Sequence, residues 1–213
     1  MKQKIFRLAL TEAALTLLWV VLLILNEVIN GPVTTLDDAL LRIQPIGILH
    51  ILTYANAAAL TIAAVLLYFA FYQYLRSDHP VMTTIGFVFV PLYGIFNLLV
   101  YLSQITIVPL MAMRNHPNLA QWMQFWPPSP IALLNQVAYA ALGIASILFG
   151  IGLMRQDSTT RIASWLLILN GIACILGLVG VLISNPILGM GSLIGGVLFL
   201  VGVAMLGFQY RRA

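Results

Sequence analysis

The sequence predicts an all-α fold, a polytopic membrane bundle of six transmembrane helices with both termini in the cytoplasm. Of the 213 residues, 62% are apolar and 8% are charged, whereas soluble domains average roughly 25% charged residues. Six long apolar segments alternate with short loops, and eight of the ten Lys and Arg residues lie on one side of this series. Because Lys and Arg accumulate in cytoplasmic loops, we predict a multi-pass protein of the bacterial inner (plasma) membrane.

The predicted spans use most of the chain, so residues 1–213 should form a single integral membrane domain. The spans cover residues 6–26, 47–75, 81–111, 130–154, 160–183 and 187–209. Crossing a bilayer takes about 20 apolar residues, which each segment supplies. The cations on the cytoplasmic side are Lys2, Lys4, Arg7, Arg76, Arg155, Arg161, Arg211 and Arg212, and the alternate loops hold Arg42 and Arg114.

Two short interfacial helices are predicted in the outer loops. The segment Thr35-Leu36-Asp37-Asp38 has the pattern of a capping box, in which Asp38 reaches back to the backbone of Thr35. The second helix should begin at Pro117 and end at Pro127 and Pro128. Trp is enriched at the membrane interface, so this helix should present to the headgroups Leu119, Trp122, Phe125 and Trp126.

Proline and capping residues predict where the spans begin. Tight starts are expected at Asp78-His79-Pro80, Ser129-Pro130 and Asn185-Pro186, because Pro suits the first helical position. Asp157 or Ser158 should cap the fifth span. Pro91 lies inside the third span and predicts a kink, since it removes one backbone donor.

Small residues indicate where helices approach closely in lipid. Four-residue spacings occur at Ala55-Ala59-Ala63, at Ala173-Gly177 and at Gly191-Gly195. We expect the last two spans to pack tightly against each other. The same seams could instead bind other membrane subunits or a second copy of the chain, and membrane lipids are partners in either case.

Polar residues inside apolar spans are costly and tend to face the bundle interior. The third span carries Tyr93, Asn97, Tyr101 and Gln104 on one face, and the fourth carries Asn135 and Tyr139. The second carries His50, Tyr54, Thr61 and Tyr68, and the first carries Glu12, Thr16, Trp19 and Asn26. These stripes should converge, either as interhelical hydrogen bonds or as a ligand cavity.

The predicted ligand cavity is lined by amides and phenols, which suit a neutral or weakly polar ligand. Its candidate binding residues are Tyr93, Asn97, Tyr101, Gln104, Asn135, Tyr139, His50 and Tyr54. His50 is expected to be a structural histidine bonded to a carbonyl or to Tyr54, although it could titrate. Glu12 is expected to be wetted from the cytoplasmic interface, the alternative being a buried proton acceptor.

Several function classes lack support in the sequence. No Lys/Arg run interleaved with aromatics suggests nucleic-acid binding. The outer residues Glu27, Asp37, Asp38, His50 and His116 are ligand types for a divalent metal but show no metal-binding spacing. A bis-histidine haem would need two histidines at membrane depth. No nucleophile motif is present and Cys174 has no histidine nearby in sequence, so we predict no cofactor and no metal, and an enzyme is disfavoured.

Two resemblances follow from this layout. The basic N-terminus, the short outer helix, and a second span ending in Leu66-Leu67-Tyr68 and Tyr74-Leu75-Arg76 resemble an uncharacterised bacterial family of six-helix membrane proteins, the domain of unknown function 4386 type. This resemblance implies a six-helix fold and no particular activity. In architecture the chain is also similar to substrate-binding subunits of energy-coupling vitamin transporters. Those subunits meet their partner through small residues of the first helix, here Ala9 and Ala13.

The leading functional hypothesis is an accessory or structural subunit of a membrane assembly, without recognisable catalytic chemistry. The alternative is a small-molecule or lipid-binding component of a membrane transporter, which the converging stripes favour. A third hypothesis, an intramembrane enzyme that uses Glu12 or His50, has the least support.

Overall fold

The computed structural model describes residues 1–43, 47–126, 129–156 and 160–211. Six helical stretches are long and apolar enough to cross a membrane, which confirms the all-α fold and the six predicted spans. They are α1 (Lys2–Asn30), α3 (Ile48–Leu75), α4 and α5 (Pro80–Ile105 and Ile107–Met113), α7 (Pro130–Gln156), α8 (Arg161–Leu182), and α9 and α10 (Pro186–Gly189 and Gly191–Arg211). The short helices are α2 (Leu36–Arg42) and α6 (Leu119–Trp122).

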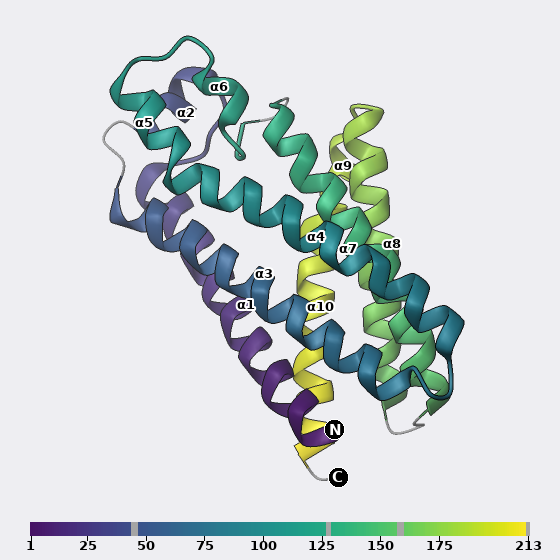
Figure 1. Ribbon diagram of the computed structural model, residues 1–213. Helices are drawn as coiled ribbons and strands as arrows, with labels where there is room; N and C mark the ends of the chain where they lie inside the picture. Colours follow the sequence, from purple (N-terminus) through teal and green to yellow (C-terminus); the bar gives the residue numbers. More distant parts are fainter. Residues whose placement is uncertain (44–46, 127–128, 157–159, 212–213) are drawn as a thin grey trace.

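The six long helices form a closed ring. Each packs against the next one along the chain, and α10 packs back against α1. Successive helices run in opposite directions, so the two chain ends lie close together (Figure 1). We call this the terminal end, and we call the opposite end, which carries α2, α5, α6 and α9, the capped end. Among the described residues, every Lys and Arg other than Arg42 and Arg114 lies at the terminal end.

Aromatic side chains fill the ring between its middle and the terminal end. Tyr68 of α3 lies 5.5 Å from Phe149 of α7 and is stacked on Phe199 of α10 at 6.2 Å between ring centroids. The Tyr68 hydroxyl shares a 2.5 Å hydrogen bond with Ser146 of α7. Outward-facing residues such as Leu17 and Ile62 are instead half exposed, as expected for surfaces that lipid covers.

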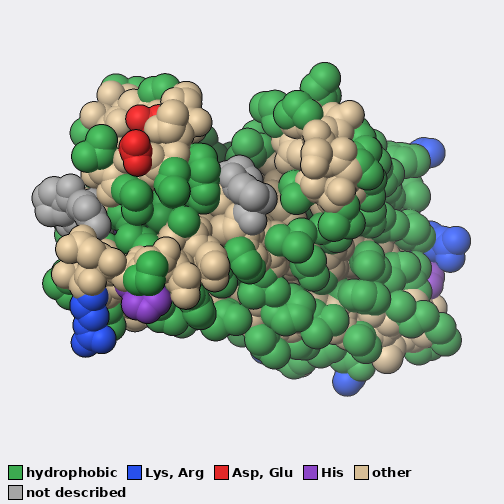
Figure 2. All heavy atoms as spheres, turned by 90° about the horizontal axis from the view of Figure 1, so that it is seen from above, with side chains coloured by type: hydrophobic (Ala, Val, Ile, Leu, Met, Phe, Trp, Pro, Cys, Tyr) green, Lys and Arg blue, Asp and Glu red, His purple; other side chains and the backbone are tan. Residues whose placement is uncertain are grey.

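The capped end contains a second, smaller cluster of apolar side chains, and we call the segments that form it the cap. Ala39 and Ile43 from α2 pack with Val108 and Ala112 from α5 and with Leu119 from α6. Leu119 is buried in this cluster and does not face outward as predicted, while Trp122, Phe125 and Trp126 are half-buried against the cluster, and their contact with the headgroups stays a prediction. Packing there lets them cover the apolar sides of α2 and α5, which would otherwise be wet at this end. Figure 2 looks onto this end and shows acidic side chains gathered on the cap.

The predicted capping box at the start of α2 is confirmed. The Thr35 hydroxyl accepts a hydrogen bond from the Asp38 backbone N–H, and the Asp38 carboxylate accepts from the backbone N–H groups of Thr34 and Thr35. These hydrogen bonds, with one from the Thr34 hydroxyl, lower the pKa of Asp38 to about 2. The charged carboxylate therefore fixes the entry into α2 at neutral pH.

The third span is interrupted at Thr106, which was not predicted. α4 continues without a break through Pro91 and ends at Ile105. Pro109 explains the interruption, because it lacks an N–H group and its ring would collide with the carbonyl group of Ile105 four residues earlier. The short helix α5 then leads into the cap.

The remaining span starts follow the predicted caps where the structure describes them. Pro80 is the first residue of α4, Ser129 accepts a hydrogen bond from Ala132 N at 3.0 Å, and Asn185 caps α9. Pro127, Pro128, Asp157 and Ser158 lie outside the described residues. The sixth span differs from its prediction because it is divided at Met190 into α9 and α10.

The predicted close packing of the last two spans is confirmed. A Cβ atom added to Gly177 of α8 would lie 2.8 Å from the backbone nitrogen of Ser192 in α10. α7 and α8 approach equally closely, because a Cβ atom on Gly143 would lie 2.6 Å from the carbonyl oxygen of Gly171. Ala9 and Ala13 are also buried within the bundle. These small residues are therefore used inside the chain, whereas Ala55 and Ala59 of the second-span stripe are exposed.

Candidate functional site

Seven of the eight predicted binding residues belong to one hydrogen-bonded network. Asn135 of α7 donates to Asn97 Oδ1 at 2.8 Å and to the Tyr101 hydroxyl at 3.3 Å, both on α4. The Tyr101 and Tyr139 hydroxyls lie 2.6 Å apart. The predicted convergence of the third-span and fourth-span stripes is therefore present in the structure.

The network continues toward the capped end through a residue that the sequence reasoning missed. Gln124, between α6 and α7, donates to Asn135 Oδ1 at 3.1 Å and accepts from the Tyr54 hydroxyl at 2.8 Å. Its backbone N–H donates to Gln104 Oε1 at 3.0 Å. The signal that could have found it is a lone amide within the aromatic run Trp122-Met-Gln-Phe-Trp126.

His50 joins the network by its ring nitrogen. Its Nε2 lies 3.1 Å from the backbone oxygen of Gln104, so the nitrogen donates and carries the hydrogen. The ring also lies 4.7 Å from that of Tyr54. His50 is thus the buried, carbonyl-bonded histidine that the sequence suggested.

Tyr93 lies beside this network. Its ring is 6.2 Å from the ring of Tyr139. Both tyrosines line a central cavity of about 30 Å³ to which all six long helices contribute. Tyr139 therefore belongs to the network and to the cavity.

Among the described residues, the first-span stripe meets the network by packing and not by hydrogen bonds, since Trp19 packs against the cluster that contains Tyr54 and Tyr101. Asn26 instead donates to Thr53 of α3 at 2.7 Å, while Glu12, Thr16 and Trp19 line the central cavity. Glu12 is fully buried, so the expectation that it is wetted from the interface is wrong. Glu12 lies on the inward face of α1, because it follows the helical spacing of the other buried positions Ile5, Ala9 and Thr16.

The network is largely satisfied by its own members, so these polar stripes act at least as interhelical hydrogen bonds. Each such bond contributes about 0.6 kcal/mol in membrane bundles. Ligand binding by the eight residues stays a prediction.

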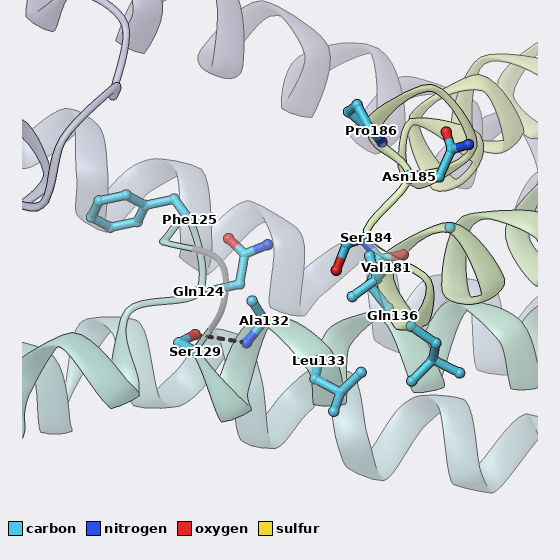
Figure 3. Close-up of a pocket in the computed structure, with 13 residues that line it drawn as sticks. Gln124, Phe125, Ser129, Ala132, Leu133, Gln136, Val181, Ser184, Asn185 and Pro186 are labelled. Carbon is cyan, nitrogen blue, oxygen red and sulfur yellow. Dashed lines mark hydrogen bonds between the residues drawn. The ribbon is translucent and has the colours of Figure 1, made fainter.

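A groove of about 700 Å³ lies beside the network, at the capped end. Figure 3 shows Gln124, Phe125 and Ser129 on one side of it and Ser184, Asn185 and Pro186 on the other. Leu133 and Gln136 of α7 contribute to its wall, as does the end of α8. Gln124 therefore connects the groove to the buried network.

The described lining of the groove carries no charged side chain. Its apolar part includes Phe125, Leu133 and Val181, and its polar part includes Gln124, Gln136 and Asn185. The Oε1 atom of Gln136 is buried and has no hydrogen-bond partner among the described residues. An unpaired buried amide oxygen costs free energy that a bound hydrogen-bond donor would recover.

The outer residues with metal-ligand side chains are engaged separately. Arg42 donates to Glu27 Oε1 at 2.9 Å and to the Gly31 carbonyl, and its guanidinium lies 5.9 Å from the Phe125 ring centre. Asp38 belongs to the capping box, and His116 Nδ1 accepts from the Asn118 backbone at 3.2 Å. Within the described residues, no three His, Cys, Asp or Glu side chains gather in a group that could hold a metal ion.

The fold and the buried polar network define an integral membrane protein with six spans. Comparison with known proteins adds no relative, since no family model, no curated protein and no solved structure matches the chain. The groove and the network are therefore the features that bear on function.

Proposed function

We propose that this protein binds a neutral amphiphile, a lipid or a lipid-like small molecule, in the groove at the capped end, as a component of a membrane transporter. The observation that carries the proposal is a groove of about 700 Å³ with apolar and amide side chains and no charge among its described lining residues. Ligand sites typically combine an apolar wall with a few polar groups that fix orientation.

The lining indicates the chemistry of the ligand. The amide side chains of Gln124, Gln136 and Asn185 suit a ligand group that forms hydrogen bonds without a charge, such as a hydroxyl. Leu133, Val181 and Leu182 suit an acyl or prenyl chain. A phosphate or carboxylate headgroup would have no cationic partner here, because Arg42 is already paired with Glu27.

We further propose that the terminal end faces the cytoplasm of a bacterium, and that the groove opens in the outer leaflet of the inner membrane. The cations at the terminal end support this orientation. We also propose that the chain is related to the uncharacterised six-helix membrane family of the domain of unknown function 4386 type.

The accessory-subunit hypothesis stays a prediction with less support. Most of the small residues that motivated it, including Ala9, Ala13 and Gly177, are buried within the chain, whereas Ala55 and Ala59 of α3 are exposed and stay open to a partner. A partner that uses a predicted seam would therefore have to bind at Ala55 and Ala59. A second chain that co-purifies in fixed ratio with the protein would restore this hypothesis.

Photo-crosslinking in lipid nanodiscs tests the groove. A photoactivatable diacylglycerol should label residues 129–136 and 181–189, and photoactivatable phosphatidylglycerol should label them much less. Leu133→Trp fills the groove and should abolish this labelling. Gln136→Leu should weaken it about five-fold, the equivalent of one net hydrogen bond of about 1 kcal/mol.

Leu99→Trp is the matched control, because Leu99 is half exposed on α4 and does not line the groove. It should leave the labelling unchanged. Equal labelling of all lipid-facing helices, or labelling that persists in Leu133→Trp, would show ordinary surrounding lipid and contradict the proposal.

A further inference from the structure

Glu12 is a buried carboxyl group that does not line the groove, so it has no part in the proposed ligand site. It lies in α1 about 15 Å along the helix axis from Lys2, at a rise of about 1.5 Å per residue. Its exposure is 0%, and neither carboxyl oxygen has a hydrogen-bond partner among the described residues. The side chain lines the central cavity of about 30 Å³.

The neighbours of Glu12 offer oxygen acceptors. The Thr16 hydroxyl donates its single hydrogen to the backbone carbonyl of Glu12 at 2.8 Å, so it can only accept from a guest. Asn170 of α8 donates its amide nitrogen to Ser146 at 2.8 Å. Its oxygen receives only a 3.4 Å contact from Cys174.

None of the described residues that line the cavity is a cation that could balance this carboxyl group. The titratable groups of the other cavity-lining helices are Tyr93 of α4, Tyr139 of α7 and Cys174 of α8, while α10 contributes Gly196 and Phe199. On α3 the cavity meets Leu60, and Tyr68 is bonded to Ser146. A charged carboxylate in a low-dielectric interior without a partner is strongly disfavoured, so something else must neutralise it.

We propose that Glu12 is an exchangeable binding site for one monovalent cation, a proton or Na⁺, at the centre of the ring. The cavity has room for a guest of the size of a water molecule, which needs roughly 10–15 Å³ of such space. One carboxylate balances a single positive charge. A divalent metal would require more carboxylates and about six oxygen ligands or more.

The sequence makes this site directly observable. The chain has two glutamates, Glu12 and Glu27. Glu27 is exposed and paired with Arg42, so Glu27→Gln should fold. Protein labelled at the glutamate side-chain carboxyl and carrying Glu27→Gln then gives one infrared carboxyl signal, that of Glu12, and this signal distinguishes the acid from the carboxylate.

The experiment has two arms in nanodiscs of a neutral lipid. In the first, pH is varied in choline chloride. In the second, NaCl replaces choline chloride at fixed pH and ionic strength. If Glu12 binds only protons, its infrared signal should change between the acid and the carboxylate form with pH alone. If Glu12 also binds sodium, the signal should change when Na⁺ is added as well.

Glu12→Gln confirms the assignment, because the signal should disappear in labelled Glu12→Gln/Glu27→Gln protein. Should that variant fail to fold, labelled wild type still separates the two glutamates, since only one of them is exposed. A Glu12 signal that stays acid, or stays carboxylate, under every pH and Na⁺ condition in which the bundle is folded would overturn the proposal. Groove labelling by diacylglycerol does not enter this readout, so the two proposals fail independently.

Discussion

At the residue scale, the side chain of Asn135 joins separate parts of the bundle. Its nitrogen binds Asn97 and Tyr101 of α4, and its oxygen binds Gln124 beside the groove. Such a residue fixes the register between helices and supports the groove at the same time.

Replacing Asn135 by Leu should destabilise the bundle by about 1–3 kcal/mol, because Asn97 and Gln124 would lose their partner in a buried place. In the double variant Asn97→Leu/Asn135→Leu, part of this loss should be recovered, since removing both partners of a buried pair is less costly than removing one. Thermal unfolding in detergent measures both. Asn118→Leu, at an exposed position, is the control. If the double variant lost as much stability as Asn97→Leu and Asn135→Leu lose in total, the two residues would not be coupled.

Individual residues differ in how well the sequence predicts them. The capping box of Thr35 and Asp38 is local, because all its partners lie within four residues. The network at Asn135 also follows from helical spacing. Whether Glu12 is wet or dry depends on cavity-lining residues of α8 and α10, such as Asn170 and Phe199, which are more than 150 residues away in the chain and leave no local signature at Glu12.

At the scale of elements, close packing depends on glycine at the crossing of α7 and α8. Gly143→Ala should destabilise the bundle by about 1–3 kcal/mol, because the added methyl group would lie 2.6 Å from the Gly171 carbonyl oxygen. Gly196→Ala is the matched control, since nothing lies within 4 Å of its added Cβ atom. That variant should be neutral or stabilising by up to about 1 kcal/mol through helix propensity.

Denaturant or thermal unfolding in the same detergent compares the two glycine variants. If Gly143→Ala were as stable as wild type, α7 and α8 could move apart at little cost in free energy, and the prediction would be wrong.

The elements themselves were largely predictable, because apolar length and proline position are local properties. All six spans and both short helices were found this way. The break at Thr106 has a local cause in Pro109, but the long apolar run around it has the pattern of one continuous span. The inward packing of Leu119, Trp122 and Phe125 was not predictable, since it depends on the apolar cluster that α2 and α5 form together.

At the scale of the whole molecule, the sequence indicates which faces are polar but not how the spans are ordered around the interior. The closed ring, with α1 between α3 and α10, comes from packing between distant segments. For the same reason the groove could not be foreseen: it forms where the α6–α7 segment and the α8–α9 turn lie on either side of α7. The sequence therefore predicted the hydrogen-bonded network of the candidate site, but not the groove or the volume of the central cavity.

The closed ring has a consequence for chain connectivity. Lys2 Nζ lies 5.7 Å from the centre of the Tyr210 ring, so the two natural ends are neighbours. A circular permutant, with these ends joined by a flexible linker and new ends opened between Asp78 and His79, should insert and fold with a melting temperature close to that of wild type. Both the old and the new ends lie on the same side of the bilayer, so every helix keeps its direction of insertion. Opening the chain between Ser184 and Asn185, on the opposite side, would force the first helix to insert in reverse, and that permutant should be degraded.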